Sequence, residues 1–213
     1  MDTNPSKELD HSKKAYWDDR FSKMKNTADE WLLSAEDAYE LVHPFFRPES
    51  EILDLGCGLS ALARLLFDKG FHNLTCIDFS HTAVTKAANR AEGRTVEHSV
   101  MDTTHLYYPS ETFDVVIDKG TLDSVLCGSD SFVRASATLQ EVYRVLKPNG
   151  FFISISQAPP EQRMNHLSTV HLPWEVRHKE VKAQPGPDVV VRSTKLHVYL
   201  CTRPGPRSES LDS

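Results

Sequence analysis

The sequence lacks the features that define several protein classes. No apolar run among its 213 residues approaches the roughly 18–20 residues that a membrane-spanning helix needs, so we expect no membrane association. Its four cysteines stand 19, 51 and 74 residues apart, without a C-x-x-C pair or a zinc-like spacing to the ten histidines. The first 14 residues contain neither an apolar signal core nor an Arg-rich presequence. We therefore expect free thiols, no metal site and a cytoplasmic location.

A basic excess is also missing. Lys and Arg number 24 against 30 Asp and Glu, a net charge of −6, which argues against a nucleic-acid partner. The length corresponds to one domain, and 39% hydrophobic residues are typical of a soluble globule. We predict a disordered N-terminus over 1–14, a single domain over 15–203 and a disordered Pro/Ser-rich tail over 204–213. We expect a monomer.

The middle of the chain alternates short apolar runs with helical patterns. Helical periodicity covers much of 15–48, and the sequence predicts further helices over 61–69, 80–91 and 131–146. Strands are predicted over 51–55, 74–78, 95–100, 113–118 and 151–156, followed by an irregular segment over 157–173. Two more strands, 174–181 and 195–201, have no helix between them and should pair as an antiparallel hairpin. The pattern predicts an α/β fold with a doubly wound seven-stranded sheet, mostly parallel with a C-terminal antiparallel hairpin.

Four carboxylates stand at the ends of four successive predicted strands. Asp54, Asp78, Asp102 and Asp118 are spaced 24, 24 and 16 residues apart, one strand–helix unit at a time. Ligands of open parallel sheets bind outside the carboxyl ends of the strands, so we expect these acids to form one rim of a binding site.

The turn after the first strand, Asp54-Leu55-Gly56-Cys57-Gly58-Leu59-Ser60, allows close approach of the backbone to a ligand. On its own, the turn fits a dinucleotide fingerprint, another nucleotide-type cofactor or a structural tight turn. Two features favour a cofactor with a cationic end. A carboxylate two residues before the first glycine suits an ammonium or sulfonium group and repels a pyrophosphate. The later run EVYRVLKPNGFFI (141–153) is not typical of dehydrogenases.

Taken in order, the segments DLGCG, CIDFS, MD, FDVVIDKGTLD and EVYRVLKPNGFFI resemble class I S-adenosylmethionine (SAM)-dependent methyltransferases. The resemblance covers residues 15–201 and implies a Rossmann-like sheet. A narrower resemblance adds Y-W-D-x-R-F upstream, G-C-G-x-S, D-K-G-T-L-D and the final HVYL. These segments are similar to the methyltransferase-like group that contains the elongation factor 1-alpha lysine methyltransferases.

The resemblance implies a set of SAM contacts. Gly56 and Gly58, with Asp54 just before them, would flank the methionine and ribose, and Asp78 would accept the ribose hydroxyls. Phe79 would lie against the adenine, and Asp102, with Met101 or Thr103, would meet its N6 edge. Asp118, as the candidate catalytic residue, and Lys119 would lie at the methionine end. Aromatic residues would close over the cofactor: Trp17, Phe21 and Trp31.

Each assignment has a structural alternative. Asp78 could cap the following helix, Asp102 could be a turn residue, and Asp118 with Lys119 could form a surface ion pair. Trp17 and Phe21, four residues apart, could pack in the core.

The resemblance implies methyl transfer from SAM to a lysine of a protein substrate, with a translation elongation factor as a candidate. The alternatives are a small-molecule O- or N-methyltransferase and a non-catalytic SAM-binding partner subunit. Bringing a lysine amine from a pKa near 10.4 to its neutral form at pH 7.4 costs about 4 kcal/mol. Asp118 is the candidate to orient that amine.

Overall fold

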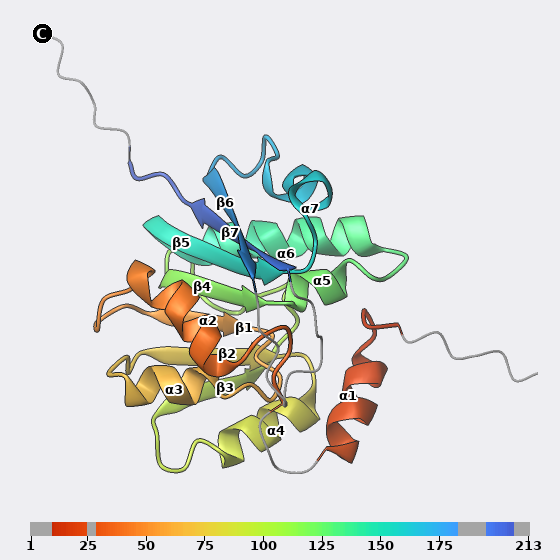
Figure 1. Ribbon diagram of the computed structural model, residues 1–213, viewed down its shortest axis with the longest axis vertical. Helices are drawn as coiled ribbons and strands as arrows, with labels where there is room; N and C mark the ends of the chain where they lie inside the picture. Colours follow the sequence, from red (N-terminus) through yellow and green to blue (C-terminus); the bar gives the residue numbers. More distant parts are fainter. Residues whose placement is uncertain (1–9, 25–28, 183–194, 207–213) are drawn as a thin grey trace, which may run out of the picture.

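The computed structural model describes residues 10–24, 29–182 and 195–206. One seven-stranded sheet has the order β3-β2-β1-β4-β5-β7-β6 and crosses the molecule (Figure 1). Its parallel strands are β1 (Ile52–Leu55), β2 (Leu74–Asp78), β3 (Val96–Val100), β4 (Phe113–Lys119) and β5 (Leu146–Ser156). The last two strands, β6 (Glu175–Lys182) and β7 (Lys195–Thr202), pair antiparallel, and β7 joins β5. The predicted sheet and its C-terminal hairpin are confirmed.

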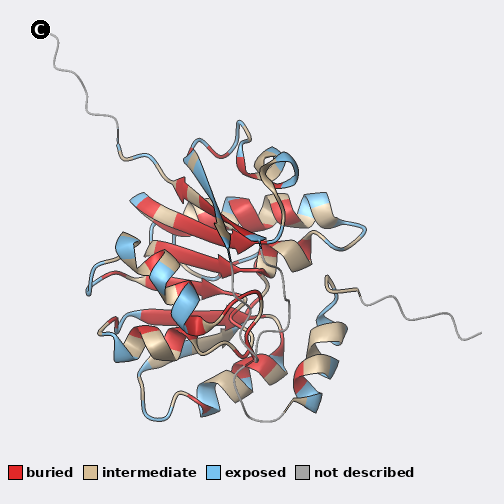
Figure 2. Cartoon of the chain, in the orientation of Figure 1, coloured by how far each residue is buried: buried red, intermediate tan, exposed pale blue. Residues whose placement is uncertain are grey.

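Alternating side chains divide the strands between two cores. Leu53 and Leu55 of β1 face one cluster, which includes α5 (Thr121–Val125), α6 (Ser131–Val145) and α7 (Pro160–Leu167). Ile52 faces the other cluster, with α2 (Ala35–Val42) and α3 (Leu62–Asp68). Strands with buried residues on both faces belong to a sheet covered by helices on both sides. Figure 2 shows burial concentrated on the central strands, away from the helix surfaces.

Two helices lie near the end of the sheet formed by β2 and β3. The helix α4 (His81–Asn89) begins at Ser80, whose hydroxyl accepts a hydrogen bond from the amide of Ala83. The helix α1 (Lys14–Lys23) packs against α4, where Phe21 joins Leu59 in a small separate cluster (Figure 1). This contact brings the N-terminal helix to the carboxyl ends of the strands.

The structure differs from the sequence-based expectation in several places. The strand β5 begins at Leu146, five residues before the predicted strand over 151–156. The helical region over 15–48 is interrupted, because residues 29–34 form a non-helical segment before α2, which the 3₁₀ turn η1 (His43–Phe45) follows. Two short helices, α5 and α7, were not predicted. The prolines of 157–173 led to the prediction of an irregular segment. Pro160, however, starts α7 in the first helical turn, where its missing N–H costs nothing. Residues 1–9 and 207–213 of the two expected disordered tails lie outside the described residues, as does the loop between β6 and β7.

Candidate active site

A pocket opens at the carboxyl ends of β1 and β4, the two neighbouring strands from which the chain winds in opposite directions. This is the place where open α/β sheets bind ligands. The pocket and the open solvent at its mouth together span about 840 Å³. Its lining comes from the N-terminal segment, residues 29–31, the turn after β1, the end of β2, the loop after β3 and the β4–α5 turn. Of the residues that the sequence assigned to the cofactor, these line the pocket: Trp17, Phe21, Trp31, Asp54, Gly56, Gly58, Asp78, Phe79, Asp102, Thr103 and Lys119.

The glycine turn is held tightly against its neighbours. The amides of Gly56 and Cys57 both donate to the carbonyl oxygen of Ile77, at 2.8 and 2.9 Å. Gly56 has φ +74°, and a Cβ atom there would lie 2.1 Å from Oγ1 of Thr121. Neither the backbone conformation nor the available space admits a side chain at position 56. The turn therefore exposes backbone to the pocket.

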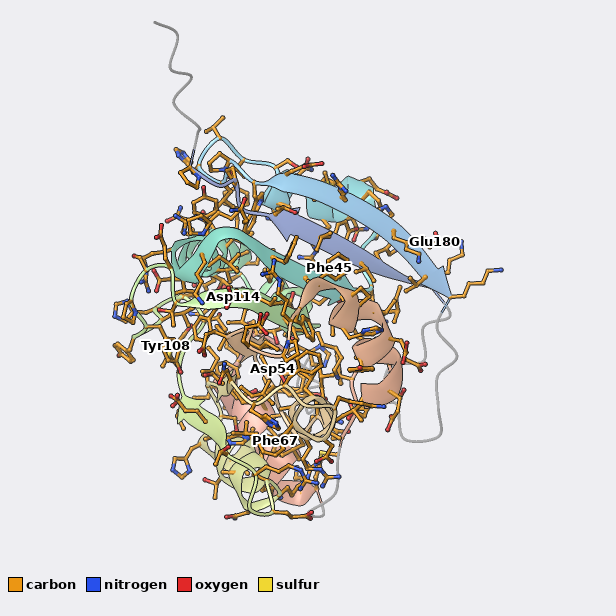
Figure 3. All side chains as sticks on the ribbon, turned by 90° about the vertical axis from the view of Figure 1, so that its left-hand side faces the viewer. Phe45, Asp54, Phe67, Tyr108, Asp114 and Glu180 are labelled. Atoms are coloured by element: carbon orange, nitrogen blue, oxygen red, sulfur yellow. The ribbon has the colours of Figure 1, made fainter. Side chains whose placement is uncertain are left out.

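Asp54 lines the pocket with an unpartnered carboxyl oxygen. Its side chain is buried in the middle of the molecule (Figure 3), and its Oδ2 has no hydrogen-bond partner among the described residues. Burial raises the pKa of this carboxyl well above its ordinary value, and the nearby Cys76 adds to the rise. An orphaned buried acceptor is costly without a donor or a cation. The site thus suits a ligand with a positive group next to Asp54.

Asp78 and Asp102 mark another part of the pocket. The two oxygens of Asp78 accept from the amides of Ser80 at 2.8 Å and Gly58 at 3.0 Å, which orients the carboxylate. Burial nevertheless raises the pKa of Asp78 to about 6. Asp102 pairs with Arg134 at 3.0 Å and accepts from Thr104. Burial raises the pKa of Asp102, but these partners outweigh it and the net shift is downward.

A buried ion pair joins three segments around the pocket. Nζ of Lys119 lies 3.0 Å from Oε2 of Glu30 and also donates to the carbonyl oxygen of Trp31. The same Glu30 carboxylate accepts from the hydroxyl of Ser60 at 2.9 Å and from the amide of Ala61 at 2.7 Å. The segment before α2, the glycine turn and the end of β4 are therefore fixed to one another.

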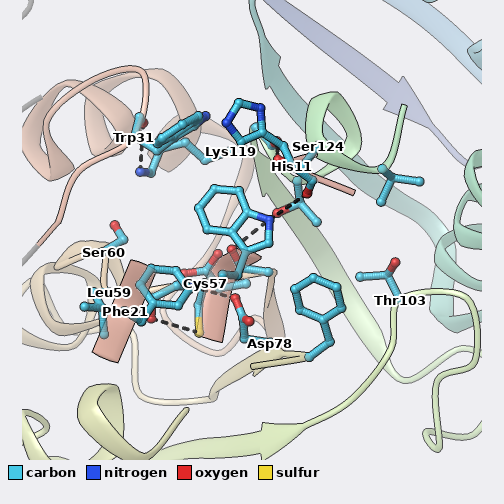
Figure 4. A pocket seen from close by; sticks show the side chains of 18 of the residues that line it. His11, Phe21, Trp31, Cys57, Leu59, Ser60, Asp78, Thr103, Lys119 and Ser124 are labelled. Atoms are coloured by element: carbon cyan, nitrogen blue, oxygen red, sulfur yellow. Dashed lines mark hydrogen bonds between the residues drawn. The ribbon is translucent and has the colours of Figure 1, made fainter. Parts of the chain in front are cut away.

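Aromatic rings cover the pocket on the side of α1. Trp17 stacks on Phe21 at a centroid distance of 5.4 Å and meets Trp31 edge to face at 5.4 Å. His11 lies 6.0 Å from Trp17 and 5.9 Å from Trp31. Figure 4 shows His11 and Trp31 near Lys119, with Asp78 across the pocket. These rings shield the interior from water.

Two predicted site residues lie outside this pocket. Asp118 is fully buried, its Oδ1 accepts from the amides of Thr121 and Leu122, and its Oδ2 accepts from the hydroxyl of Ser154. Its partners lie within the fold, and through them its carboxylate holds the β4–α5 turn. Met101 packs in the core and lines an adjoining groove, where its sulfur accepts from an amide.

Several residues of the site were not predicted from the sequence. His11, Ser12 and Arg134 line the pocket, and Glu30 anchors its wall. His11 and Ser12 belong to the polar N-terminal segment 1–14, which was predicted to be disordered from its composition. The sequence gives little indication of the role of Glu30, because a charged residue in a segment of helical periodicity is usually exposed to solvent.

The structural alternatives can now be compared with the geometry. Asp118 and Lys119 are buried with different partners, so the interpretation as a surface ion pair is wrong. Ser80, not Asp78, provides the N-cap of α4.

Cys57, Cys76, Cys127 and Cys201 are free thiols. Within the described parts of the chain, no cluster of three or more metal-ligating side chains occurs. None of the described helices is long and apolar enough to cross a membrane.

Comparison with known proteins supports the geometry. Residues 53–154 match a family described as "Methyltransferase domain". The EEF1A lysine methyltransferase 4 proteins of Bos taurus and Mus musculus are each 37% identical, over 184 and 187 residues that cover 82% of this chain and 72% of each relative. The eEF1A lysine and N-terminal methyltransferase of Mus musculus is 32% identical over 188 residues, 85% of this chain and 27% of that much longer protein.

Solved structures share the fold. A SAM-dependent methyltransferase from Methanosarcina mazei superposes with a TM-score of 0.62 at 18% identity, over 79% of this chain and 99% of its own. The [4+2]-cyclase SpnF gives a TM-score of 0.65 at 17% identity, over 84% and 87% of the two chains. A cyclase with this architecture illustrates that fold alone does not define a reaction.

Fold, site and sequence likeness together define a SAM-dependent methyltransferase, with SAM as its cofactor. Within that class, the chain belongs to the family of the EEF1A lysine methyltransferases.

Proposed function

We propose that this methyltransferase transfers a methyl group from SAM to a lysine side chain of a protein, and that its substrate is eEF1A. The observation that carries the proposal is the 37% identity, over 82% of the chain, to two proteins named EEF1A lysine methyltransferase 4. The net charge of −6 also suits a substrate whose target lies in a basic, lysine-bearing surface.

The residues present fit SAM. The orphaned Oδ2 of Asp54 supplies the acceptor that the ammonium of the methionine moiety requires. Asp78, already oriented by two amides, would accept the ribose hydroxyls, and Phe79 would lie against the adenine. Asp102 and Thr103 would meet the edge of the base. The backbone of Gly56 and Gly58 would approach the methionine and ribose, while the aromatic cover of Trp17, Phe21 and Trp31 would close over them.

SAM supplies a methyl group activated by a sulfonium. The chain then has to position the acceptor amine in line with that group and keep water away. The aromatic cover excludes water, and the Glu30–Lys119 pair fixes the walls. Asp118 does not itself line the pocket, so we assign it the role of holding Thr121, which does and whose hydroxyl donates to the carbonyl oxygen of Leu55 at 2.8 Å.

We further propose that the protein acts as a cytoplasmic monomer with a single methyltransferase domain over 15–203 and with no nucleic-acid or membrane partner. The support is compositional and chemical. Four free thiols suit a reducing compartment. The acidic balance is opposite to the basic footprint of a nucleic-acid binder.

The test uses an extract of cells that lack this enzyme, incubated with the purified protein and SAM labelled on its methyl group. The proposal predicts label on a protein of the size of eEF1A, and its loss with the Asp78→Ala variant. Label found only in small molecules would show the small-molecule alternative to be right. SAM binding by calorimetry without any labelled product would favour the non-catalytic alternative.

A further inference from the structure

His11 occupies the wall of the pocket where a substrate amine would enter. Its ring lies beside Trp31 and Ser124, near Lys119 and across the pocket from Asp78 (Figure 4). Asp78 marks the ribose in the proposed mode of binding, so His11 stands at the other part of the pocket, near the reacting methyl group. Its imidazole makes no hydrogen bond to any residue that the structure describes, and it is only partly buried.

Most of the other ionisable side chains of the pocket have partners. Asp29 pairs with Arg20 at 2.8 Å, Asp102 with Arg134 and Lys119 with Glu30. Asp78 accepts hydrogen bonds from two backbone amides. Asp54 has an unpartnered oxygen, which the ammonium of SAM would bind in the proposed mode of binding. Asp118, the acid expected to orient the amine, is not among the residues that line the pocket, and its oxygens accept from Thr121 and Ser154. Imidazole exchanges protons between pH 5 and 8, which is the range in which the enzyme must take one from an ammonium.

We propose that His11 is the catalytic residue that accepts the proton of the substrate lysine; this inference rests on the proposed lysine methyltransferase function. The ammonium proton passes to an imidazole nitrogen, and the amine lone pair forms the new N–C bond while the electron pair of the C–S bond stays on sulfur. The imidazolium then releases the proton to water. Every atom and charge is accounted for by the amine, the methyl donor, His11 and solvent.

The surroundings of His11 hold it over the pocket and place an acid beside it. The indole Nε1 of Trp17 donates to the carbonyl oxygen of His11 at 2.7 Å, which holds the residue over the pocket. The adjacent Asp10 attracts a positive His11, an interaction that helps to lower the pKa of that carboxyl, after its hydrogen bonds from Ser12. The rings of Trp17 and Trp31 lie next to the imidazole, at centroid distances of 6.0 and 5.9 Å.

Other charges also surround this position. They come from the N-terminal segment, α1, the segment before α2, the end of β4 and α5: Asp10, Lys13, Lys14, Asp18, Arg20, Asp29, Glu30, Lys119 and Asp123. Most are neutralised in pairs. Lys14 binds Asp18, Arg20 binds Asp29 and Lys119 binds Glu30, while Asp10 next to His11 forms no ion pair with a described residue.

The test compares His11→Phe, which keeps an aromatic ring in the cover, with His11→Asn, which keeps polarity without a usable base. We expect both variants to lower kcat about 100-fold at pH 7, a typical loss of general-base catalysis. The deficit shrinks about tenfold per pH unit toward pH 9–10, because the free amine then forms without help. In His11→Gly, added imidazole restores part of the rate. His72→Gln, an exposed histidine just before β2, is the matched control and leaves kcat unchanged.

A second readout needs no turnover. Imidazole NMR resonances of His11, assigned by their absence in His11→Phe, are titrated with SAM and with S-adenosylhomocysteine, which lacks the sulfonium charge. We expect the His11 titration to move to lower pH with SAM than with S-adenosylhomocysteine, because the sulfonium repels an imidazolium. SAM affinity of His11→Phe by calorimetry stays within about threefold of wild type, since the aromatic cover persists.

Different failures can be told apart. If the wild-type protein labels no lysine of eEF1A, the proposed function fails, whatever His11 does. If it labels eEF1A and His11→Phe keeps the wild-type kcat and pH profile, only the role of His11 is refuted. A deficit in both variants that is equal at pH 7 and pH 9.5 also refutes it, as does a loss that lies wholly in SAM affinity.

Discussion

The buried pair of Glu30 and Lys119 provides the sharpest test of how the pocket is held together. Their side chains are 8% and 6% exposed, and the Glu30 carboxylate has three donors: Lys119 Nζ, the Ser60 hydroxyl and the Ala61 amide. Glu30→Gln keeps the shape of the side chain and an oxygen that can accept from the Ala61 amide, but it leaves the buried charge of Lys119 without an anion. Removing one partner of a buried pair costs about 3–5 kcal/mol.

For a chain of this size, each kcal/mol lowers Tm by about 2–4 °C, so Glu30→Gln should lower Tm by about 6–20 °C. The free energy of unfolding from urea titration measures the same loss. The double variant Glu30→Gln/Lys119→Met removes both charges and should recover most of the stability. Replacing a buried ion pair by uncharged residues of similar size changes the free energy of unfolding little.

Asp19→Asn is the matched control, because Asp19 pairs with Lys23 on the surface, where the side chains are 63% and 71% exposed. Its Tm should not change measurably. A Tm of Glu30→Gln within about 2 °C of wild type would refute the account of the pair. So would a double variant no more stable than the single one.

Three further predictions follow from the site. SAM binding below pH 7 should release protons, because burial raises the pKa of Asp54 well above its ordinary range and that of Asp78 to about 6, and both must ionise to face an ammonium and ribose hydroxyls. Calorimetry in buffers of different ionisation enthalpy measures this, and affinity that rises as pH falls would contradict it. Gly120→Ala should weaken SAM binding at least tenfold, since its φ is +82° and its Cβ would lie 2.7 Å from Trp31; Gly70→Ala, at φ +98° with no atom within 4 Å, should cost only about 1 kcal/mol of backbone strain and leave binding intact. Burial raises the pKa of Asp118 from 3.8 to about 6, so its protonation stabilises the fold at low pH and that contribution is lost as pH rises through 6. Asp118→Asn should remove this part of the pH dependence in urea titrations while keeping kcat within a few-fold, and a kcat loss of 100-fold would restore Asp118 as the catalytic residue.

The sheet was readable from the sequence because each strand carries its own signal. The runs at 52–55, 74–78 and 113–119 are short, apolar and followed by an acid or a glycine turn, and parallel strands buried on both faces leave just this pattern. Most of the pocket followed from topology, since the carboxyl ends of such strands meet at one edge.

The parts of the site that were not predicted depend on contacts between residues far apart in the sequence. Local sequence patterns do not contain such contacts. Glu30 acquires its role from Lys119, 89 positions away. His11 stands in a polar segment, and its ring contacts with Trp17 and Trp31 lie at the pocket. Asp118 lies at the end of a strand as Asp54 and Asp78 do, yet the amides of the following helix bind its carboxylate and it does not line the pocket. A strand-end position predicts proximity to a site but not the direction of a side chain.

The central claim is tested most directly with purified eEF1A, the wild-type protein and SAM that carries an isotopically labelled methyl group. Mass spectrometry of the digested eEF1A then locates the label. The account predicts a labelled methyl group on Nζ of a lysine, absent when Asp78→Ala replaces the wild-type enzyme. An unmodified eEF1A, or label on another kind of side chain, from an enzyme that binds SAM in calorimetry would contradict it.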